Sequence, residues 1–138
     1  MTPGDKEVLL KDLCARLPYG VKAYVKNWSK FDRKYYEGVY TVESIHPSLN
    51  NILVYSERCS VEVIVGYDDY EIKPYLFPIT SMTEEQRNEY HELVRGMFGT
   101  GVLINFEVLE EFFHKNHIDY RGLIPMGLAL DAIYLNIY

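Results

Sequence analysis

The residues with the clearest potential for chemistry are two histidines, His114 and His117, near the end of a predicted helix. Glu110 lies four positions before His114, so one helical face can present these three side chains, and Asp119 follows close behind. Imidazole and carboxylate groups bind Zn²⁺, and a catalytic zinc keeps one position open for water. One hypothesis is therefore a metal-dependent hydrolase. Histidines in a last turn also suit the helix dipole without any metal, and we favour that structural interpretation.

A second candidate is the basic, aromatic tract over residues 22–36, where five Lys/Arg residues and five aromatic residues accompany a single acid. Such a tract suits single-stranded nucleic acid, because rings stack on bases and cations neutralise phosphates. The same rings suit a peptide-binding groove. A charged loop whose rings fold back on the core is the structural alternative. The candidate binding residues are Trp28, Phe31, Arg33, Lys34, Tyr35 and Tyr36.

A third candidate is Arg121, which precedes a glycine in the apolar C-terminal segment. A guanidinium can bind an anion, but we expect Arg121 to pair with Asp119 or Asp131 and so fix a turn. The chain has no phosphate-binding glycine loop and no nucleophile-elbow motif. The sequence therefore predicts neither catalytic residues nor a cofactor, and it favours a non-enzymatic protein.

Length, composition and charge place these candidates in one globular domain spanning residues 1–138. The chain is 48% hydrophobic and 25% charged, which is typical of a folded protein. Residues 1–76 carry ten Lys/Arg against eleven Asp/Glu, whereas residues 77–138 carry four against nine. Because the second half is acidic, it disfavours nucleic acid as a partner of the whole protein.

The two cysteines, Cys14 and Cys59, are far apart and lack the spacing of a metal site, so we expect two reduced, partly buried thiols. The first residues lack a basic start followed by an apolar core, which is the pattern of a signal peptide. No apolar run reaches the length of a membrane helix. We therefore expect a cytoplasmic protein without a membrane partner.

Residue patterns divide the domain into three parts. Residues 1–19 form a helix with Asp5 as its N-cap and an apolar stripe on one face. Residues 20–76 are β-rich, and residues 77–138 contain two helices and an apolar tail. Thr83 with Gln86, or Ser81 with Glu84, matches a capping box for the first of these helices, and Asn105 is expected to cap the second. The expected strands are 21–28, 36–45, 52–55, 61–65 and 70–74.

Short strands joined by brief turns predict an antiparallel meander. The expected fold is therefore α+β: a small antiparallel SH3-like barrel or roll, with an N-terminal helix and two C-terminal helices packed on it. An open sheet covered by helices is the alternative.

Three stretches carry a resemblance to known proteins: LLKDLCARLPYGV at 9–21, IKPYLFP at 72–78 running into SMTEE at 81–85, and DYRGLI at 119–124 followed by GLA at 127–129. Together they resemble a family of small uncharacterised proteins from Bacteroides-type gut bacteria and their phages or prophages. The resemblance implies a bacterial setting related to phages or mobile elements. It implies no reaction and no functional residues.

The leading hypothesis is a non-catalytic interaction module that binds a protein or peptide through the region from Trp28 to Tyr36. Aromatic-rich composition and strand edges able to accept another strand motivate it. A nucleic-acid-binding protein using the basic aromatic tract 22–36 is the alternative, and the metal-dependent hydrolase is the third hypothesis.

Overall fold

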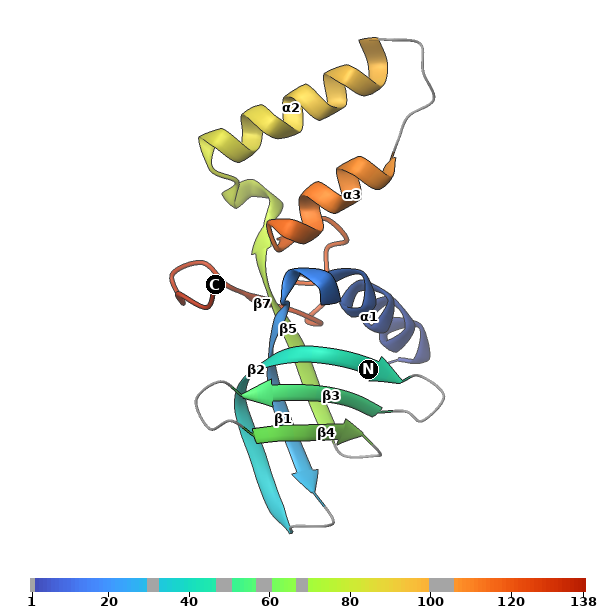
Figure 1. The fold of residues 1–138 in the computed structure, drawn as a ribbon, viewed down its shortest axis with the longest axis vertical. Coiled ribbons are helices and arrows are strands. Elements are labelled where there is room, and N and C mark those ends of the chain that lie inside the picture. The colour runs from blue at the N-terminus through green and yellow to red at the C-terminus, as the bar shows by residue number, and fades with distance from the viewer. Residues whose placement is uncertain (1, 30–32, 47–50, 57–60, 67–69, 100–105) are drawn as a thin grey trace.

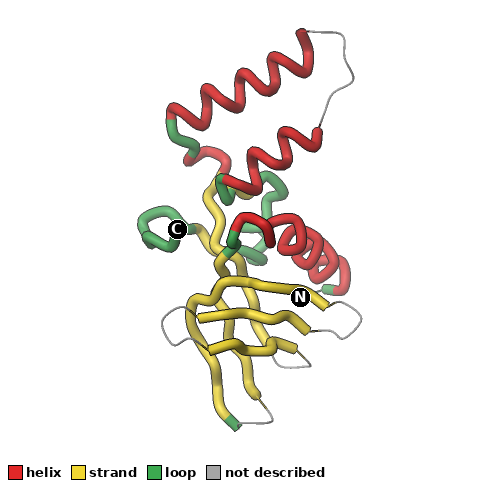
Figure 2. The backbone as a smooth tube through the Cα atoms, in the orientation of Figure 1, coloured by secondary structure: helices red, strands yellow, loops and turns green. Residues whose placement is uncertain are grey.

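The fold places a curled β-sheet at one end of the molecule and two helices at the other (Figures 1 and 2). It is seen in a computed structural model that describes residues 2–29, 33–46, 51–56, 61–66, 70–99 and 106–138. A third helix covers part of the sheet between these two ends. The predicted α+β class is confirmed.

The N-terminal helix α1 (Pro3–Arg16) begins earlier than expected, because its N-cap is Thr2 and not Asp5. Asp5 occupies the third helical position, where its carboxylate accepts a hydrogen bond from the Thr2 amide while the Thr2 hydroxyl accepts one from the Asp5 amide. This reciprocal arrangement is a capping box. A short 3₁₀ turn, η1 (Leu17–Tyr19), follows the helix, and Gly20 ends it with a left-handed φ of 68°.

Five antiparallel strands form the predicted meander: β1 (Lys22–Ser29), β2 (Lys34–His46), β3 (Asn51–Ser56), β4 (Val61–Gly66) and β5 (Tyr70–Pro78). The strand order along the main path of the sheet is β4-β3-β2-β1-β5-β6. The sheet is not closed, so the predicted barrel is not formed, although the antiparallel pairing of the first five strands is confirmed.

Two short parallel strands make the sheet mixed, which the sequence did not indicate. Strand β6 (Ile118–Asp119) pairs with the last residues of β5, and β7 (Leu130–Asp131) pairs with β5 at Tyr75 and Leu76. Strand β5 therefore runs beyond the meander and anchors the C-terminal segment (Figure 1).

The long strand β2 belongs to both halves of the meander. Its first eight residues pair with β1, and its later residues pair with β3. A β-bulge between Val42 and Ser44 interrupts the register with β3. Because a bulge bends its strand, β2 can turn across the top of the sheet and carry β3 and β4 with it (Figure 1).

The main hydrophobic core lies between α1 and the concave face of this sheet. Alternate residues of β1 point inward, as the period of a strand requires, and Leu9 and Leu13 of α1 cover them. The buried members of this core are Leu9, Leu13, Val21, Ala23, Val25, Tyr40, Val42, Ile52, Val54 and Ile72.

Helices α2 (Glu84–Gly99) and α3 (Phe106–Lys115) pack mainly against each other, and α3 also contacts α1 and β6. They lie away from the five-stranded meander and do not cover it, contrary to the prediction (Figure 1). The predicted capping box is confirmed for Thr83 with Gln86. The Ser81 hydroxyl instead donates to the Pro78 carbonyl oxygen at 2.6 Å. Asn105 lies outside the described residues.

Candidate functional site

The first predicted site lies at the free end of the hairpin formed by β1 and β2. In this hairpin Trp28 is opposite Tyr35, so both side chains lie on the same face of the sheet. Their ring centroids are 4.7 Å apart with an angle of 56° between the planes. Tyr35 is 68% exposed and Trp28 is half-buried. An aromatic pair is therefore presented to solvent on the convex face of the sheet, away from the core.

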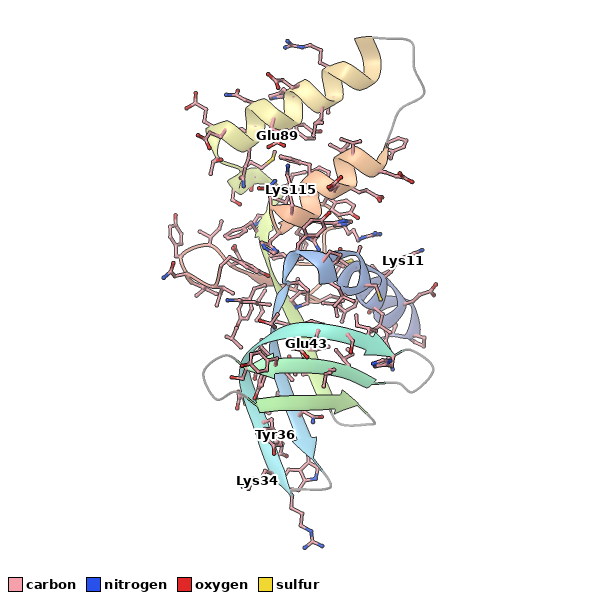
Figure 3. All side chains as sticks on the ribbon, viewed as in Figure 1. Lys11, Lys34, Tyr36, Glu43, Glu89 and Lys115 are labelled. Atoms are coloured by element: carbon pink, nitrogen blue, oxygen red, sulfur yellow. The ribbon has the colours of Figure 1, made fainter. Side chains whose placement is uncertain are left out.

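Two exposed cations accompany this aromatic pair. Lys34 begins β2 at the end of the molecule farthest from α2 and α3 (Figure 3), and Arg33 precedes it with a left-handed φ of 53°. Within the described part of the chain neither cation makes an ion pair. Phe31 lies outside the described residues. Four of the six predicted binding residues are near this end of the hairpin: Trp28, Arg33, Lys34 and Tyr35. Lys34 lies opposite Ser29, so its strand position faces away from the aromatic pair, as that of Tyr36 does.

Tyr36 lies on the opposite face of β2. It is opposite Asn27, a buried residue, and its ring packs against the main core. The sequence held a signal for this orientation, because Tyr36 has the same strand parity as Tyr40 and Val42, which are buried. Adjacent tyrosines in β2 therefore serve different purposes: Tyr35 is exposed to solvent, whereas Tyr36 contributes to packing.

The convex face continues from the hairpin end across β5. The Tyr24 hydroxyl donates to Glu37 Oε1 at 2.7 Å, and this hydrogen bond to a carboxylate raises the pKa of Tyr24 to about 12. On the neighbouring strand Lys73 Nζ lies 3.2 Å from Glu71 Oε1. Val39 is 41% exposed on this face. The middle of the face thus mixes apolar surface with charges that already have partners.

The histidines of the second predicted site have separate environments. His114 is buried, and its Nε2 lies 3.0 Å from the Tyr120 hydroxyl. Burial, followed by the Arg16 charge, lowers the pKa of His114. The His117 ring instead stacks on Tyr138, with centroids 3.6 Å apart, and burial lowers its pKa to about 4. Both imidazoles are therefore expected to be neutral at pH 7.

The other members of the proposed metal site do not complete a set of ligands with these imidazoles. The Asp119 carboxylate accepts hydrogen bonds from the amides of Leu123 and Ile124, both at 2.8 Å. Glu110 is exposed. Across the described ranges, no group of three His, Cys, Asp or Glu side chains is placed to hold a metal ion. The Asp119 carboxylate closes the turn after β6, which explains its burial.

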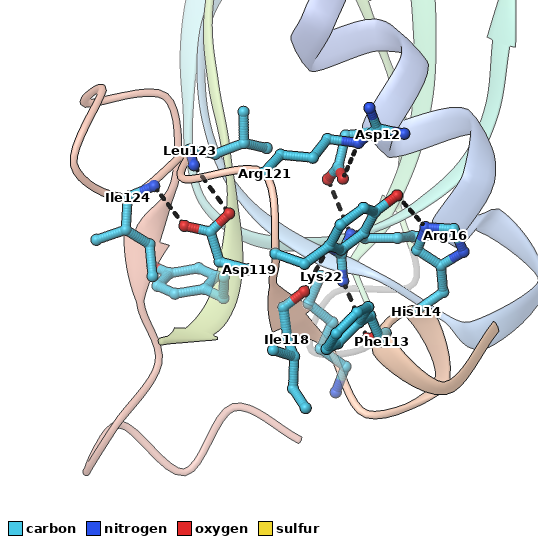
Figure 4. Close-up of polar contacts among 12 residues, drawn as sticks. Asp12, Arg16, Lys22, Phe113, His114, Ile118, Asp119, Arg121, Leu123 and Ile124 are labelled. Carbon is cyan, nitrogen blue, oxygen red and sulfur yellow. Dashed lines mark hydrogen bonds and ion pairs between the residues drawn. The ribbon is translucent and has the colours of Figure 1, made fainter. Parts of the chain in front are cut away.

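A buried ionic cluster that the sequence did not predict lies beside His114 (Figure 4). Arg16 is fully buried, and its Nε donates to Asp12 Oδ2 at 2.8 Å while Nη2 donates to the Ile118 carbonyl oxygen at 2.7 Å. The other Asp12 oxygen lies 3.3 Å from Arg121 Nε. The prediction that Arg121 pairs with Asp119 or Asp131 was therefore wrong.

The cluster joins segments that are distant in sequence. The Arg16 and Arg121 guanidiniums lie 5.8 Å and 5.0 Å from the centroid of the Tyr120 ring, which stacks on Phe113. Asp12 and Arg16 are four apart in a helix, and that spacing among the apolar residues of α1 was the available signal. Because Arg16 donates to the Phe113 and Ile118 carbonyl oxygens and Arg121 lies beside Asp12, this cluster is best explained as a structural link between α1 and the C-terminal segment, hereafter the clamp.

Comparisons with known proteins do not add a family assignment. No family model matches the sequence, and no curated protein or solved structure matches it significantly. None of the helices within the described ranges is both long enough and apolar enough to cross a membrane.

Proposed function

We propose that the protein is a non-catalytic interaction module that binds a protein or peptide on the convex face of the β1–β2 hairpin. The observation that carries this proposal is the exposed Trp28–Tyr35 pair. Aromatic side chains supply large contact areas at low entropic cost and dominate the binding energy of many interfaces. Here the pair is presented at the end of a hairpin whose other face is fixed by the core.

The architecture supports the same proposal. We infer an SH3-like roll from the five-stranded meander and from the bent strand β2 that both of its halves share. Strand β4 is at an edge and pairs, among the described strands, with β3 alone. Such an edge can accept a strand from a partner. On the resemblance described above, we also place this function in a bacterial cytoplasm, in a setting related to phages or mobile elements.

Substitution of the aromatic pair, compared with substitution of an exposed tyrosine elsewhere, tests the proposal. In a pull-down with the full chain, a double substitution Trp28→Ala and Tyr35→Ala is expected to abolish capture of the specific partner. Tyr134→Ala is the matched control, because Tyr134 is fully exposed but lies outside the hairpin. If every captured protein is retained by the double variant, the hairpin face is not the binding surface.

Nucleic acid is a second candidate ligand. The net charge of −6 disfavours it, but the distribution of the charges over the molecule favours it. The acidic residues of α2 and α3 lie at the opposite end of the molecule from Lys34 (Figure 3). Arg33 and Lys34 are therefore not neutralised by them, and the adjacent rings can stack on bases. This candidate predicts that a single-stranded oligonucleotide binds and that its affinity falls steeply with added salt. A gel-shift titration at low salt without any shifted species would reject it.

A further inference from the structure

The charges of the hairpin differ between its tip and the middle of the convex face. At the hairpin end, Lys34 and Arg33 are exposed and have no ionic partner within the described residues. Lys34 lies opposite Ser29 and shares the strand parity of Tyr36, so the two cations are at the tip of the hairpin and do not form one row of the convex face.

In the middle of the convex face, Lys26 lies opposite Glu37 on one side and Glu71 on the other. Lys73 lies 3.2 Å from Glu71, so lysines accompany both glutamates there. Of these four cations, the two that have neither an ion pair nor an acid opposite them within the described residues are therefore at the tip.

This arrangement distinguishes between possible ligands. A nucleic acid has phosphates at regular intervals, so a strand lying along the hairpin would place phosphates over Glu37 and Glu71 as well as over the cations. A peptide can restrict its carboxylates to one end. It can then place carboxylates at Arg33 and Lys34 and an apolar side chain against Trp28 and Tyr35, without approaching the two glutamates.

We propose that the partner presents an acidic peptide segment, whose carboxylates bind Arg33 and Lys34 and whose adjoining apolar residue packs on the Trp28–Tyr35 pair. The proposal rests on the proposed function and adds the chemistry of the partner to it. Charge complementarity carries it, because the hairpin end is a basic area on a protein with a net charge of −6. The carboxylates of the segment lie at one end, and uncharged residues follow toward the middle of the face.

Selection from a random-peptide display library, with the full chain as bait, tests the partner chemistry directly. Peptides that also bind the Trp28→Ala, Tyr35→Ala variant are removed by counter-selection, so that only ligands of the hairpin face remain. We expect the remaining peptides to be enriched in Asp and Glu next to an apolar residue.

Charge reversal then tests how a selected peptide binds. Arg33→Asp with Lys34→Glu is expected to weaken binding about tenfold or more, because two attractive contacts become repulsive. Asp is chosen at position 33 because it tolerates a positive φ. Lys11→Glu on α1 is the control, since Lys11 is exposed and lies away from the hairpin (Figure 3). Circular dichroism verifies that each variant is folded.

Each outcome decides a different question. Acidic peptides that respond to the double charge reversal and not to Lys11→Glu support the inference. Peptides that need Trp28 and Tyr35 but are not acidic, or that ignore the charge reversal, overturn the inference and leave the proposed function intact. If no peptide depends on the aromatic pair, both fail. If single-stranded oligothymidylate binds the same face more tightly than any peptide, nucleic acid replaces the acidic segment as the ligand.

Discussion

Arg16 and Asp12 form a charged pair with no solvent exposure. Through this pair, the packing of helix α1 depends on contacts with the C-terminal segment. Removing charges from water is costly, and the cost is recovered only when each group has good partners. Arg16 satisfies this condition through Asp12 and two backbone carbonyl groups, those of Phe113 and Ile118. The pair therefore ties α1 to a segment about a hundred residues away, as the separation of 102 positions between Arg16 and Ile118 shows.

Asp12→Ala is predicted to lower the free energy of unfolding by about 3–5 kcal/mol, because it leaves a buried guanidinium without its counter-charge. Lys115→Ala is the matched control. It removes the ion pair with Glu89, in which both side chains are nearly half exposed, and it should cost less than about 1 kcal/mol. Urea unfolding followed by circular dichroism measures both values. Equal losses in the two variants would contradict the clamp.

The lowered pKa of His117 predicts how the free energy of unfolding depends on pH. Its folded pKa of about 4 is lower than the ordinary value of 6.5, so the unfolded chain binds this proton more readily. The stabilisation from a neutral His117 is therefore complete above pH 6.5, and it is lost as the pH falls from 6.5 toward 4. Solvent screening around this half-buried ring reduces the expected loss to about 1–2 kcal/mol.

Comparison with His117→Asn isolates that contribution, because His114 titrates in both proteins. Asparagine is chosen because residue 117 has a φ of 56°, a conformation that Asn tolerates well. The free energy of unfolding, measured between neutral and mildly acidic pH, should fall less steeply in the variant. Identical slopes would show that His117 does not contribute.

At the scale of elements, β2 determines what the hairpin can present to a partner. Its alternation places Tyr36, Tyr40 and Val42 toward the core and Glu37 and Val39 toward solvent. The β-bulge then redirects the strand toward β3. The rigid inner face of the hairpin is what holds the aromatic pair of the outer face in place.

Neighbouring tyrosines in β2 offer a test of this alternation. Tyr36→Ala is predicted to destabilise the fold by about 2–3 kcal/mol, because it removes a ring that packs on the core. Tyr35→Ala should cost less than about 1 kcal/mol, because most of that ring faces water. Chemical unfolding of the two variants gives both numbers. The reverse order would mean that the register of the hairpin is shifted by one residue.

The elements that could be predicted from sequence are those whose signals are local. Three local signals depend only on near neighbours: the alternation in residues 21–28, the β-branched run 61–65 and the capping pair Thr83–Gln86. Each corresponds to an observed strand or helix start. Strands β6 and β7 are two residues long and exist only because β5 is beside them, so no local pattern marks them.

The candidate site was predicted less completely for the same reason. The residue types of the basic aromatic tract were visible, but the face on which each lies requires the hairpin register. The partner of Arg121 could not be chosen from sequence. Asp119 and Asp131 are close in the chain, whereas Asp12 becomes a neighbour only after α1 packs against the C-terminal segment.

At the scale of the whole molecule, the C-terminal segment closes the gap between two strands. The ladder between β1 and β5 stops at Ala23 and Pro74. Beyond it, the Tyr138 hydroxyl accepts a hydrogen bond from the Lys22 amide at 3.0 Å and donates one to the Tyr75 carbonyl oxygen at 2.7 Å. This hydroxyl takes the place of the next backbone hydrogen bonds between the strands, and burial raises the pKa of Tyr138 to about 12.

Tyr138→Phe is therefore predicted to destabilise the protein by about 1–2 kcal/mol, because two backbone groups lose their hydrogen-bond partner while the stacking on His117 is kept. Hydrogen exchange at the Lys22 amide should become faster in the variant. The Val25 amide, in the middle of β1, is the internal control. Unchanged exchange at Lys22 would show that the hydroxyl does not bridge the strands.

Trp28 is the single tryptophan of the chain, and it lies opposite Tyr35, one position from Lys34 at the end of the molecule farthest from α2 and α3. Its intrinsic fluorescence therefore reports on the hairpin, whereas far-ultraviolet ellipticity comes mainly from the helices, of which α2 and α3 lie at the far end. During denaturation, coincident transitions by the two signals would show that both ends melt as one cooperative unit. An earlier loss of part of the ellipticity would show that α2 and α3 unfold while the indole is still in its native surroundings.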